Sequence, residues 1–400
     1  MAIYEQFLYR FSKSYFMDLT REEEKLLDGS EGEALSSAYR ILAAVGEATD
    51  ASKLVPVQWA HVSGVNYNTI GEAGRKFLEK FSLDAKVRVR TTINPMGFDR
   101  EKPSGISQEF VSKQMSIVES YKEMGAIESY TCIPYEVYQL PKHDSIVSFA
   151  ETNAAVFVNS ISGLLTNKES ALSALASAIT GKAPLSELRI KELRIPKHII
   201  RSSFDMKTEL DFGLLGYFAG KEIRGSSVGI QGVNIKTVGE AKALSAGIGT
   251  TGDIGMFVLN KQSMGDSISF GKSEANSIRD ELNTAEKGDI VLYGSPQLGL
   301  DELELLARNT EGKKFTKPCI IFCPRELRNQ AKANGIVDQL ESTGAKFMCD
   351  CCICLTPLVT KENADSVVTN SVKGAYYMKN ANNLGVALQD SYSITKEYMT

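Results

Sequence analysis

The amino-acid sequence predicts an α/β protein with several lobes, in which parallel βαβ units surround a central cleft. The clearest sign is the regular alternation of apolar runs and amphipathic helical stretches from residue 289 onward. The composition agrees, because 43% hydrophobic and 24% charged residues in a chain of 400 are typical of a folded globular protein. A chain of this length can form more than one lobe and leave a cleft between them.

The first half of the chain contains helices and strands with recognisable boundaries. Asp18 or Thr20 can cap the first helix, and the acidic residues that follow are favoured by the helix dipole. Gly125 and Gly181 are placed to end two later helices, because glycine adopts the left-handed conformation at a C-terminus. We predict helices at residues 18–46, 107–125 and 169–179, and strands at 54–60, 85–92, 129–135 and 146–151.

The second half contains one unclear region and one clear region. Residues 204–260 are rich in glycine and too weakly periodic for a firm assignment. From residue 289 strands and helices alternate, which predicts a parallel sheet with helices on its faces. We predict strands at 290–294, 319–323 and 345–350, and helices at 301–309, 326–335 and 337–342.

Charge and hydropathy exclude several classes of partner. The formal net charge of −4 gives no reason to expect nucleic acid. No run of about 18 apolar residues is present, so we expect no membrane association. The first twenty residues mix aromatic and charged side chains and lack the features of a signal peptide. Seven cysteines, an odd number, argue against a secreted disulfide framework, and we expect a cytoplasmic protein.

Polar and cysteine side chains gather at the predicted ends of strands. In open α/β sheets, ligands bind in the crevice beyond the carboxyl ends of the strands. One such position is ordinary, but several in different strand–loop units predict a shared site. The positions are His61, Ser63, Thr91, Thr92, Asn94, Cys132, Pro296, Cys323 and Cys352.

The cysteines are candidate metal ligands. Cys132, Cys323 and Cys352 lie in different segments, and their spacing alone does not distinguish them from buried core cysteines. Four cysteines in the six residues Cys349–Cys354 are hard to explain as packing. Zinc is an alternative to an iron–sulfur cluster, because cysteine ligands suit both. Cys319 faces the same side of its strand as Cys323 and is expected in the core.

Two further side chains have both a structural and a functional interpretation. His61, one of three histidines, is either a hydrogen-bonded structural residue or a substrate contact. Glu151 follows an apolar strand, and a carboxylate in such surroundings must be paired or neutral. A buried structural role and a catalytic role both stay open for it. The turn at residues 294–296 could present backbone N–H groups to an anion, although such turns are common.

Together these segments resemble the aconitase X family, from about Met17 to Tyr377. The resemblance implies an aconitase-like fold with an N-terminal extension at 1–16, an α/β region at 17–285 and a βαβ lobe at 286–400 that carries two cluster cysteines. The family's small swivelling domain is expected on a separate subunit. The motifs are MDLTREEEKLLDG, AHVSG, TTINP, TCIPY, AETNAAVFVNSISG, ITGKAP, YGSP and TNSVKGAYY.

The resemblance also implies a cofactor and a set of site residues. Cys132, Cys323 and Cys352 would bind a [4Fe–4S] cluster with one iron free to act as a Lewis acid. Glu151 would place the substrate hydroxyl, and a serine of the small subunit would be the base. The contacts expected for an anionic small-molecule substrate are His61, Ser63, Thr91, Thr92, Asn94, Asn153, Asn159, Ser160 and Lys373.

The implied activity is that of a hydro-lyase subunit. The expected reaction dehydrates mevalonate 5-phosphate to trans-anhydromevalonate 5-phosphate in an archaeal mevalonate pathway, with a heterodimer as the enzyme. Alternatives are dehydration of cis-3-hydroxy-L-proline, a metal-free hydro-lyase with Glu151 as base, and a non-catalytic, metal-stabilised assembly subunit. The chain departs from the family pattern at Gln297, where histidine is common, and at the extra cysteines Cys349, Cys351 and Cys354.

Overall fold

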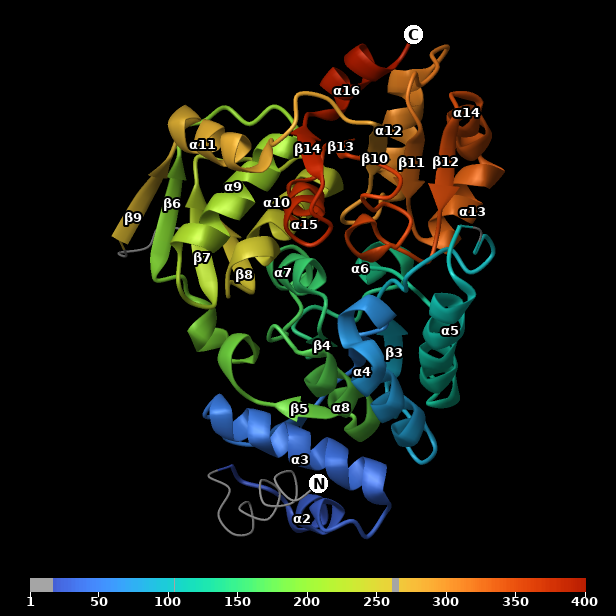
Figure 1. The fold of residues 1–400 in the computed structure, drawn as a ribbon. Coiled ribbons are helices and arrows are strands. Elements are labelled where there is room, and N and C mark those ends of the chain that lie inside the picture. The colour runs from blue at the N-terminus through green and yellow to red at the C-terminus, as the bar shows by residue number, and fades with distance from the viewer. Residues whose placement is uncertain (1–16, 104, 261–265) are drawn as a thin grey trace.

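The computed structural model describes residues 17–103, 105–260 and 266–400, and contains three separate parallel sheets with helices packed against them. The first sheet lies in the lower half of the molecule, and the other two lie side by side above it (Figure 1). The predicted extension at residues 1–16 is outside the described residues. The α/β class predicted from the sequence is confirmed.

The first region contains a three-stranded parallel sheet of order β3-β2-β4 and a two-stranded antiparallel sheet, β1-β5. In the parallel sheet, His61 of β2 pairs with Thr92 of β3 and Phe149 of β4. The elements are α2 (Arg21–Leu27), α3 (Glu33–Ala48), β1 (Leu54–Pro56), β2 (Trp59–Val62), α4 (Tyr67–Ser82), β3 (Arg90–Ile93), α5 (Gln108–Glu123), α6 (Pro134–Val137), β4 (Ser148–Phe149), α7 (Thr152–Ser160), α8 (Ala171–Thr180), β5 (Lys182–Pro184), η1 (Glu187–Arg189) and η2 (Lys191–Arg194).

Local signals placed the helix ends of this region correctly, but one predicted strand is wrong. Thr20 caps α2 in a capping box, with its backbone N–H 2.8 Å from the Glu23 carboxylate. Gly181 ends α8 in the left-handed conformation, with φ of 70°. Residues 129–135 form no strand: the chain turns at Tyr130, with φ of 38°, and enters α6 at Pro134. Proline suits the first position of a helix because it needs no backbone donor there.

The second region has a four-stranded parallel sheet of order β8-β7-β6-β9. Its helices α9 and α10 approach closely, because a side chain at Gly216 would meet the carbonyl oxygen of Leu244 at 2.3 Å. Both helices are buried on most sides, so they lack the one-sided apolar pattern that marks a surface helix. The elements are β6 (His198–Ser202), α9 (Glu209–Glu222), β7 (Ser227–Gln231), α10 (Val238–Thr251), β8 (Met256–Leu259), β9 (Asp266–Phe270) and α11 (Lys272–Leu282).

The third region has a five-stranded parallel sheet of order β12-β11-β10-β13-β14. The βαβ pattern predicted from residue 289 to 350 is confirmed. The chain adds strands on one side of β10 and then on the other, so a crevice opens between the ends of β10 and β13. The elements are β10 (Ile290–Tyr293), α12 (Leu300–Thr310), β11 (Cys319–Phe322), α13 (Arg325–Ala333), α14 (Ile336–Ser342), β12 (Ala345–Met348), η3 (Ile353–Leu355), β13 (Ser366–Thr369), α15 (Val372–Asn380), β14 (Gly385–Leu388) and α16 (Ser391–Tyr398).

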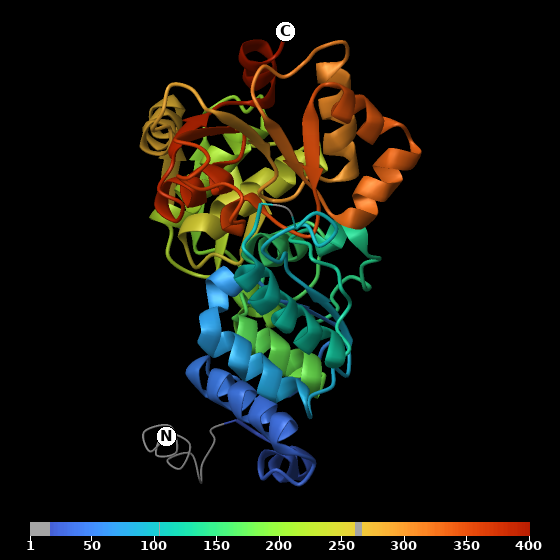
Figure 2. The ribbon, with the colours of Figure 1, turned by 45° about the vertical axis from the view of Figure 1, so that its right-hand side comes forward.

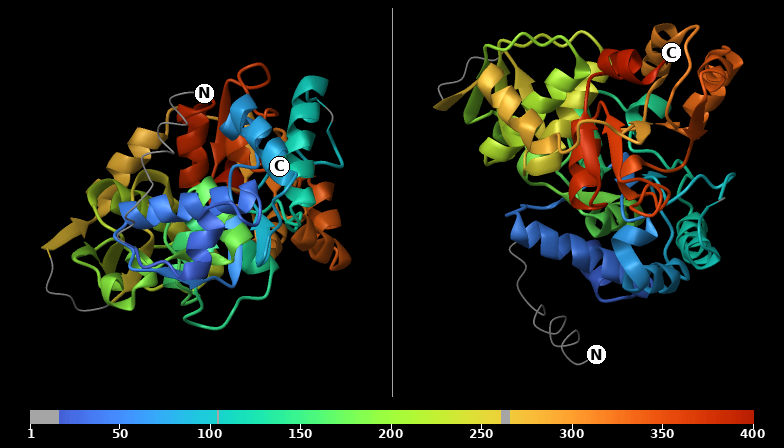
Figure 3. Two further views of the ribbon diagram at one scale, coloured as in Figure 1. Left: turned by 90° about the horizontal axis from the view of Figure 1, so that it is seen from below. Right: turned by 45° about the horizontal axis from the view of Figure 1, so that its top comes forward.

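The three regions meet in the middle of the molecule (Figure 2). Seen from below, the first region lies in front of the other two, and the view tilted by 45° shows it packed against them (Figure 3). One buried lysine joins all three: Lys242 of α10 binds Glu136 of α6 at 2.9 Å and also the carboxylate of Glu302 in α12. No helix among the described residues is long and apolar enough to span a bilayer.

Candidate functional site

A hydrogen-bonded chain of side chains begins at the carboxyl ends of β2 and β3. The ring nitrogens of His61 lie 2.8 Å from Thr92 Oγ1 and 2.8 Å from Asn94 Oδ1. Thr92 Oγ1 also accepts a hydrogen bond from the indole of Trp59 at 2.9 Å. An amide oxygen only accepts, so Nε2 of His61 carries the proton and donates to Asn94. Nδ1 then accepts from the Thr92 hydroxyl, and the ring is neutral with a fixed tautomer.

The environment of His61 favours this neutral form. The ring is fully buried. Burial lowers the pKa of His61 to about 4, although the charge of Glu151 and the hydrogen bond to Asn94 partly oppose the shift. The imidazole therefore orients Asn94 and carries no charge near neutral pH.

The buried histidine predicts a specific pH dependence of stability. Between pH 6.5 and about 4 an unfolded histidine binds a proton while folded His61 does not, so acidification favours unfolding. We expect this titration to lower the free energy of unfolding by up to about 3 kcal/mol across that interval. In His61→Gln this part of the pH-dependent decrease should be absent. Urea unfolding at several pH values measures it. His143→Gln, at a side chain 76% exposed, is the matched control. An unchanged pH slope in His61→Gln would contradict the assignment.

Glu151 and Lys373 continue the network toward the third region. Asn94 Nδ2 donates to Glu151 Oε2 at 2.6 Å, and Lys373 Nζ lies 2.5 Å from Glu151 Oε1. Glu151 is the N-cap residue of α7, and Lys373 lies in the first turn of α15. Lys373 also donates to Asn153 Oδ1 at 2.7 Å. Burial disfavours the ammonium, but the nearby Glu151 carboxylate outweighs it and the pKa of Lys373 is raised, so the pair is ionic.

The network ends at a group of buried thiols. Asn153 Nδ2 donates to the carbonyl oxygen of Cys132 at 2.9 Å. The sulfur of Cys352 has hydrogen-bonding interactions with the thiols of both Cys132 and Cys354. Cys354 Sγ lies 2.9 Å from the hydroxyl oxygen of Ser295 in the loop after β10. Three thiols from two distant segments thus gather beside Lys373 and Glu151.

These thiols differ in acidity. Burial raises the pKa of Cys132 and of Cys354 well above the ordinary value. The pKa of Cys352 is lowered, because the thiols of Cys132 and Cys354 donate hydrogen bonds to its sulfur. Three buried thiols are a soft donor set of the kind that binds iron or zinc. Among the residues at 17–103, 105–260 and 266–400, no three His, Cys, Asp or Glu side chains are already arranged as a metal site.

Cys323, the third predicted ligand, has other neighbours. Its thiol interacts with that of Cys349, and the charges of Arg328 and Asp99 act on it. Of the three cysteines predicted as ligands, Cys132 and Cys352 have thiols that interact with each other in the structure. The role of Cys323 as a ligand stays a prediction. Cys319 is in the core of the third region, as its strand position suggested.

The loop that carries Cys352 is held in place by charged and amide groups. Arg325 binds both Asp350 and Asp99 at 2.5 Å, and the Asp99 carboxylate accepts from the backbone N–H of Cys349 at 3.0 Å. Gln297 donates to the carbonyl oxygen of Cys351 at 3.0 Å. The sequence marked Gln297 only as a departure from the family pattern, whereas the structure shows that it joins two loops.

Gln297 also contacts the other thiol-bearing loop. Its side-chain oxygen accepts from the backbone N–H of Cys132 at 3.2 Å, and its own backbone N–H donates to Cys132 Sγ at 3.2 Å. The loops at Cys132 and Cys351 are therefore fixed relative to each other by one fully buried amide.

Four of the predicted substrate residues lie outside this network. Asn159 donates to the carbonyl oxygens of Thr166 and Gly255 and so fastens the first region to the second. The hydroxyls of Ser160 and Thr91 donate to backbone carbonyl oxygens. Ser63 is half-buried just beyond β2. Substrate contacts by these four residues stay predictions.

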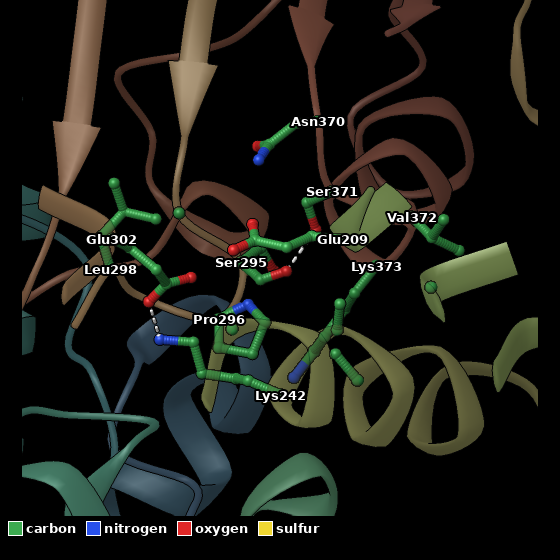
Figure 4. A pocket seen from close by; sticks show the side chains of 15 residues that line it. Glu209, Lys242, Ser295, Pro296, Leu298, Glu302, Asn370, Ser371, Val372 and Lys373 are labelled. Atoms are coloured by element: carbon green, nitrogen blue, oxygen red, sulfur yellow. Dashed lines mark hydrogen bonds and ion pairs between the residues drawn. The ribbon is translucent and has the colours of Figure 1, made fainter. Parts of the chain in front are cut away.

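A cavity of about 40 Å³ lies at the crevice between β10 and β13, and Ser295 and Lys373 are among the residues that line it. Lys242 meets the Glu302 carboxylate on one side of it, and the Ser371 hydroxyl donates to the carbonyl oxygen of Ser295 on the other (Figure 4). Burial raises the pKa of Glu302 to about 8, although Lys242 opposes the shift. Lys242 and Glu302 were not singled out from the sequence, because the two residues come from different regions and only the fold brings them together.

These observations define a class: an α/β protein of three regions whose junction holds buried thiols, a lysine–glutamate ion pair and a neutral histidine. Family models for the aconitase X first, second and third domains match residues 16–192, 196–279 and 288–400. The chain belongs to the aconitase X family.

Relatives of known name support this membership. The phosphomevalonate dehydratase large subunit of Methanocaldococcus jannaschii is 34% identical over 384 residues, which is 90% of this chain and 95% of that protein. The protein of the same name from Thermococcus kodakarensis is 33% identical, over 95% of this chain and 100% of that one. The crystal structure of Thermococcus kodakaraensis aconitase X in its holo form superposes with a TM-score of 0.90 at 32% identity, and covers 96% of this chain and 100% of that one.

A second activity occurs among more distant relatives. The cis-3-hydroxy-L-proline dehydratase of Pseudomonas aeruginosa is 28% identical over 89% of this chain. The match covers 65% of that protein. The two archaeal relatives are thus more similar to this chain than the Pseudomonas enzyme, both in sequence identity and in the share of their length that is matched.

Proposed function

We propose that this chain is the large subunit of an iron–sulfur hydro-lyase that dehydrates mevalonate 5-phosphate to trans-anhydromevalonate 5-phosphate in an archaeal mevalonate pathway. Support comes from the archaeal relatives, which carry the name of that enzyme's large subunit and match over nearly their full length. The observation that carries the proposal is the meeting of buried thiols with the Lys373–Glu151 pair at the junction of three regions.

The donor set fits the [4Fe–4S] cluster expected from the family. Cys132 and Cys352 are buried, come from different regions and have interacting thiols. With a third thiol they would hold three irons and leave the fourth without a protein ligand. When bound, that iron would supply Lewis acidity toward the substrate hydroxyl.

The side chains around the thiols can position an anionic substrate. Lys373 is a buried cation, so it can bind a carboxylate or a phosphate oxygen. Glu151 is held from both sides, by Asn94 and by Lys373, which fixes its carboxylate in one orientation. We assign Glu151 to orient the substrate hydroxyl. Neutral His61 is a positioning residue, because its hydrogen bond keeps the Asn94 amide turned toward Glu151.

The proposal requires a partner. The archaeal relatives are named large subunits, and we infer a small swivelling-domain subunit that completes a heterodimer and supplies the base, a serine, that removes the proton next to the carboxylate. We place the enzyme in the cytoplasm, where a reducing environment keeps thiols free. All seven cysteines are free and buried.

Activity of the reconstituted pair tests the function. The chain is co-purified with its small subunit without oxygen, supplied with iron and sulfide, and given mevalonate 5-phosphate or cis-3-hydroxy-L-proline. We expect a dehydrated product from mevalonate 5-phosphate only, seen by mass spectrometry as the loss of one water. Turnover of the hydroxyproline alone would replace the proposed substrate. Turnover of neither by an iron-loaded pair would favour a non-catalytic assembly subunit.

A further inference from the structure

The thiol of Cys354 lies in the same contact group as those of Cys132 and Cys352. Cys352 is the centre of the group, because its sulfur interacts with both of the others. Ser295 lies against two of them: its hydroxyl oxygen is 2.9 Å from Cys354 Sγ and 3.9 Å from Cys352 Sγ. The positive charge of Lys373 acts on all three thiols. The group therefore lies within electrostatic range of the Lys373 ammonium.

The thiol of Cys323 belongs to a different environment. Cys323 and Cys349 interact with each other, and both lie in the apolar core beneath the ends of β11 and β12. Cys319 is part of the same core. The charges that act on Cys323 come from Arg328 and Asp99, not from the residues of the network described above. A buried thiol pair in an apolar core is typical of packing.

We propose that Cys354, and not Cys323, is the third cluster ligand beside Cys132 and Cys352, and that the Ser295 hydroxyl donates a hydrogen bond to its sulfur. The inference rests on the proposed function only in requiring that the chain bind an iron–sulfur cluster. It requires no particular substrate.

The short segment around Cys352 is suited to carry two ligands. Cys352 caps the 3-10 helix η3 and Cys354 lies within it, so the two thiols leave the chain two residues apart. The ion pair of Arg325 with Asp350 fixes the start of this segment. The backbone pairing of Met96 with Cys351 holds it against the first region. The loop is thus positioned independently of any metal.

Hydrogen-bond donors to sulfur surround the same group. The Gln297 backbone N–H donates to Cys132 Sγ at 3.2 Å, and the Ser295 hydroxyl lies at donor distance from Cys354 Sγ. Donors of this kind stabilise thiolate ligands and tune the reduction potential of a cluster. No such donor to the sulfur of Cys323 is found among the described residues.

Metal content of matched cysteine variants tests the inference. Cys354→Ser, Cys323→Ser and the core control Cys319→Ala are each purified with the small subunit and reconstituted without oxygen. Iron and acid-labile sulfide per chain are measured, together with visible absorption. We expect Cys354→Ser to lower bound iron by about tenfold or more, whereas Cys323→Ser and Cys319→Ala stay within about twofold of wild type. Circular dichroism checks folding, and Cys354→Ala is a second variant if the serine disturbs the loop.

The opposite pattern overturns the inference: iron lost in Cys323→Ser and kept in both Cys354 variants. Ser295→Ala is expected to keep its iron and to shift the reduction potential downward, because it removes a hydrogen bond to sulfur. If Ser295→Ala loses iron as fully as Cys354→Ser, the proposed role of the Ser295 hydroxyl as a hydrogen-bond donor fails. Failure of the proposed function is separate: a wild-type pair that binds iron but leaves mevalonate 5-phosphate unchanged refutes the substrate and not the ligands.

Discussion

Replacing Lys373 by methionine is expected to lower kcat/KM of the reconstituted pair by about 100- to 1,000-fold. The ammonium is the only charge partner that the described residues provide for Glu151, at 2.5 Å, and the two side chains are 13% and 12% exposed. Its removal would leave the mostly buried Glu151 carboxylate without a compensating positive charge. It would also remove the hydrogen bond from Lys373 to Asn153. Steady-state kinetics with mevalonate 5-phosphate measures the effect.

The matched control for this prediction lies on the same helix. Lys379 of α15 donates to the backbone carbonyl oxygen of Glu281 at 2.7 Å and touches none of the thiols or their network. Lys379→Met should keep kcat/KM within about threefold of wild type, as expected for a change that removes no interaction made in the transition state. Activity retained in Lys373→Met, in a protein that still binds iron, would remove Lys373 from the proposed site.

Replacing Lys242 by methionine is expected to lower the free energy of unfolding by about 3 kcal/mol. Its ammonium is 2% exposed and binds Glu136, Glu302 and the carbonyl oxygen of Gln297. Without it, two carboxylates from different regions would face each other across a buried junction. Burial already raises the pKa of Glu302 to about 8, so this residue can take up a proton in the variant. Its protonation would reduce the repulsion from Glu136 and so lessen the loss in the free energy of unfolding. The midpoint of urea unfolding measures the loss.

An exposed ion pair gives the comparison. Lys221 binds Glu281 at 2.6 Å, but the lysine is 49% exposed and both charges reach water. Lys221→Met should therefore change the free energy of unfolding by no more than about 1 kcal/mol. Equal unfolding midpoints for the two variants would mean that Lys242 does not hold the three regions together.

The sequence predicted the parts of the fold that local chemistry decides. In the third region, apolar strands alternate with one-sided helices from residue 289 to 350, and β10, β11 and β12 were predicted there, whereas β13 and β14 were not. Thr20, Gly125 and Gly181 mark helix ends through capping and left-handed backbone, and these ends were found. Helices α9 and α10 were missed because their burial on most sides removes the period of 3.6 on which such predictions depend.

The site was predictable in outline because strand ends share an edge of a sheet. His61, Thr92 and Asn94 were named from their positions at strand ends and Glu151 from its place after an apolar strand. Lys373 was named only from the family resemblance. The structure joins all five in one network. Position along a strand does not show which neighbour a cysteine contacts. Cys323 ends a strand as expected, yet its thiol interacts with Cys349 across the sheet edge. Contacts across regions, such as those of Lys242, depend on the packing of whole sheets.

The most direct test of this account is the position of the metal. Crystals of the reconstituted pair, measured at the iron absorption edge, locate iron by its anomalous scattering. The account predicts a peak between the sulfurs of Cys132 and Cys352, beside the Lys373–Glu151 pair and next to Ser295. A peak beside Cys323 and Cys349, or a loaded crystal with no iron at the junction of the three regions, would contradict it.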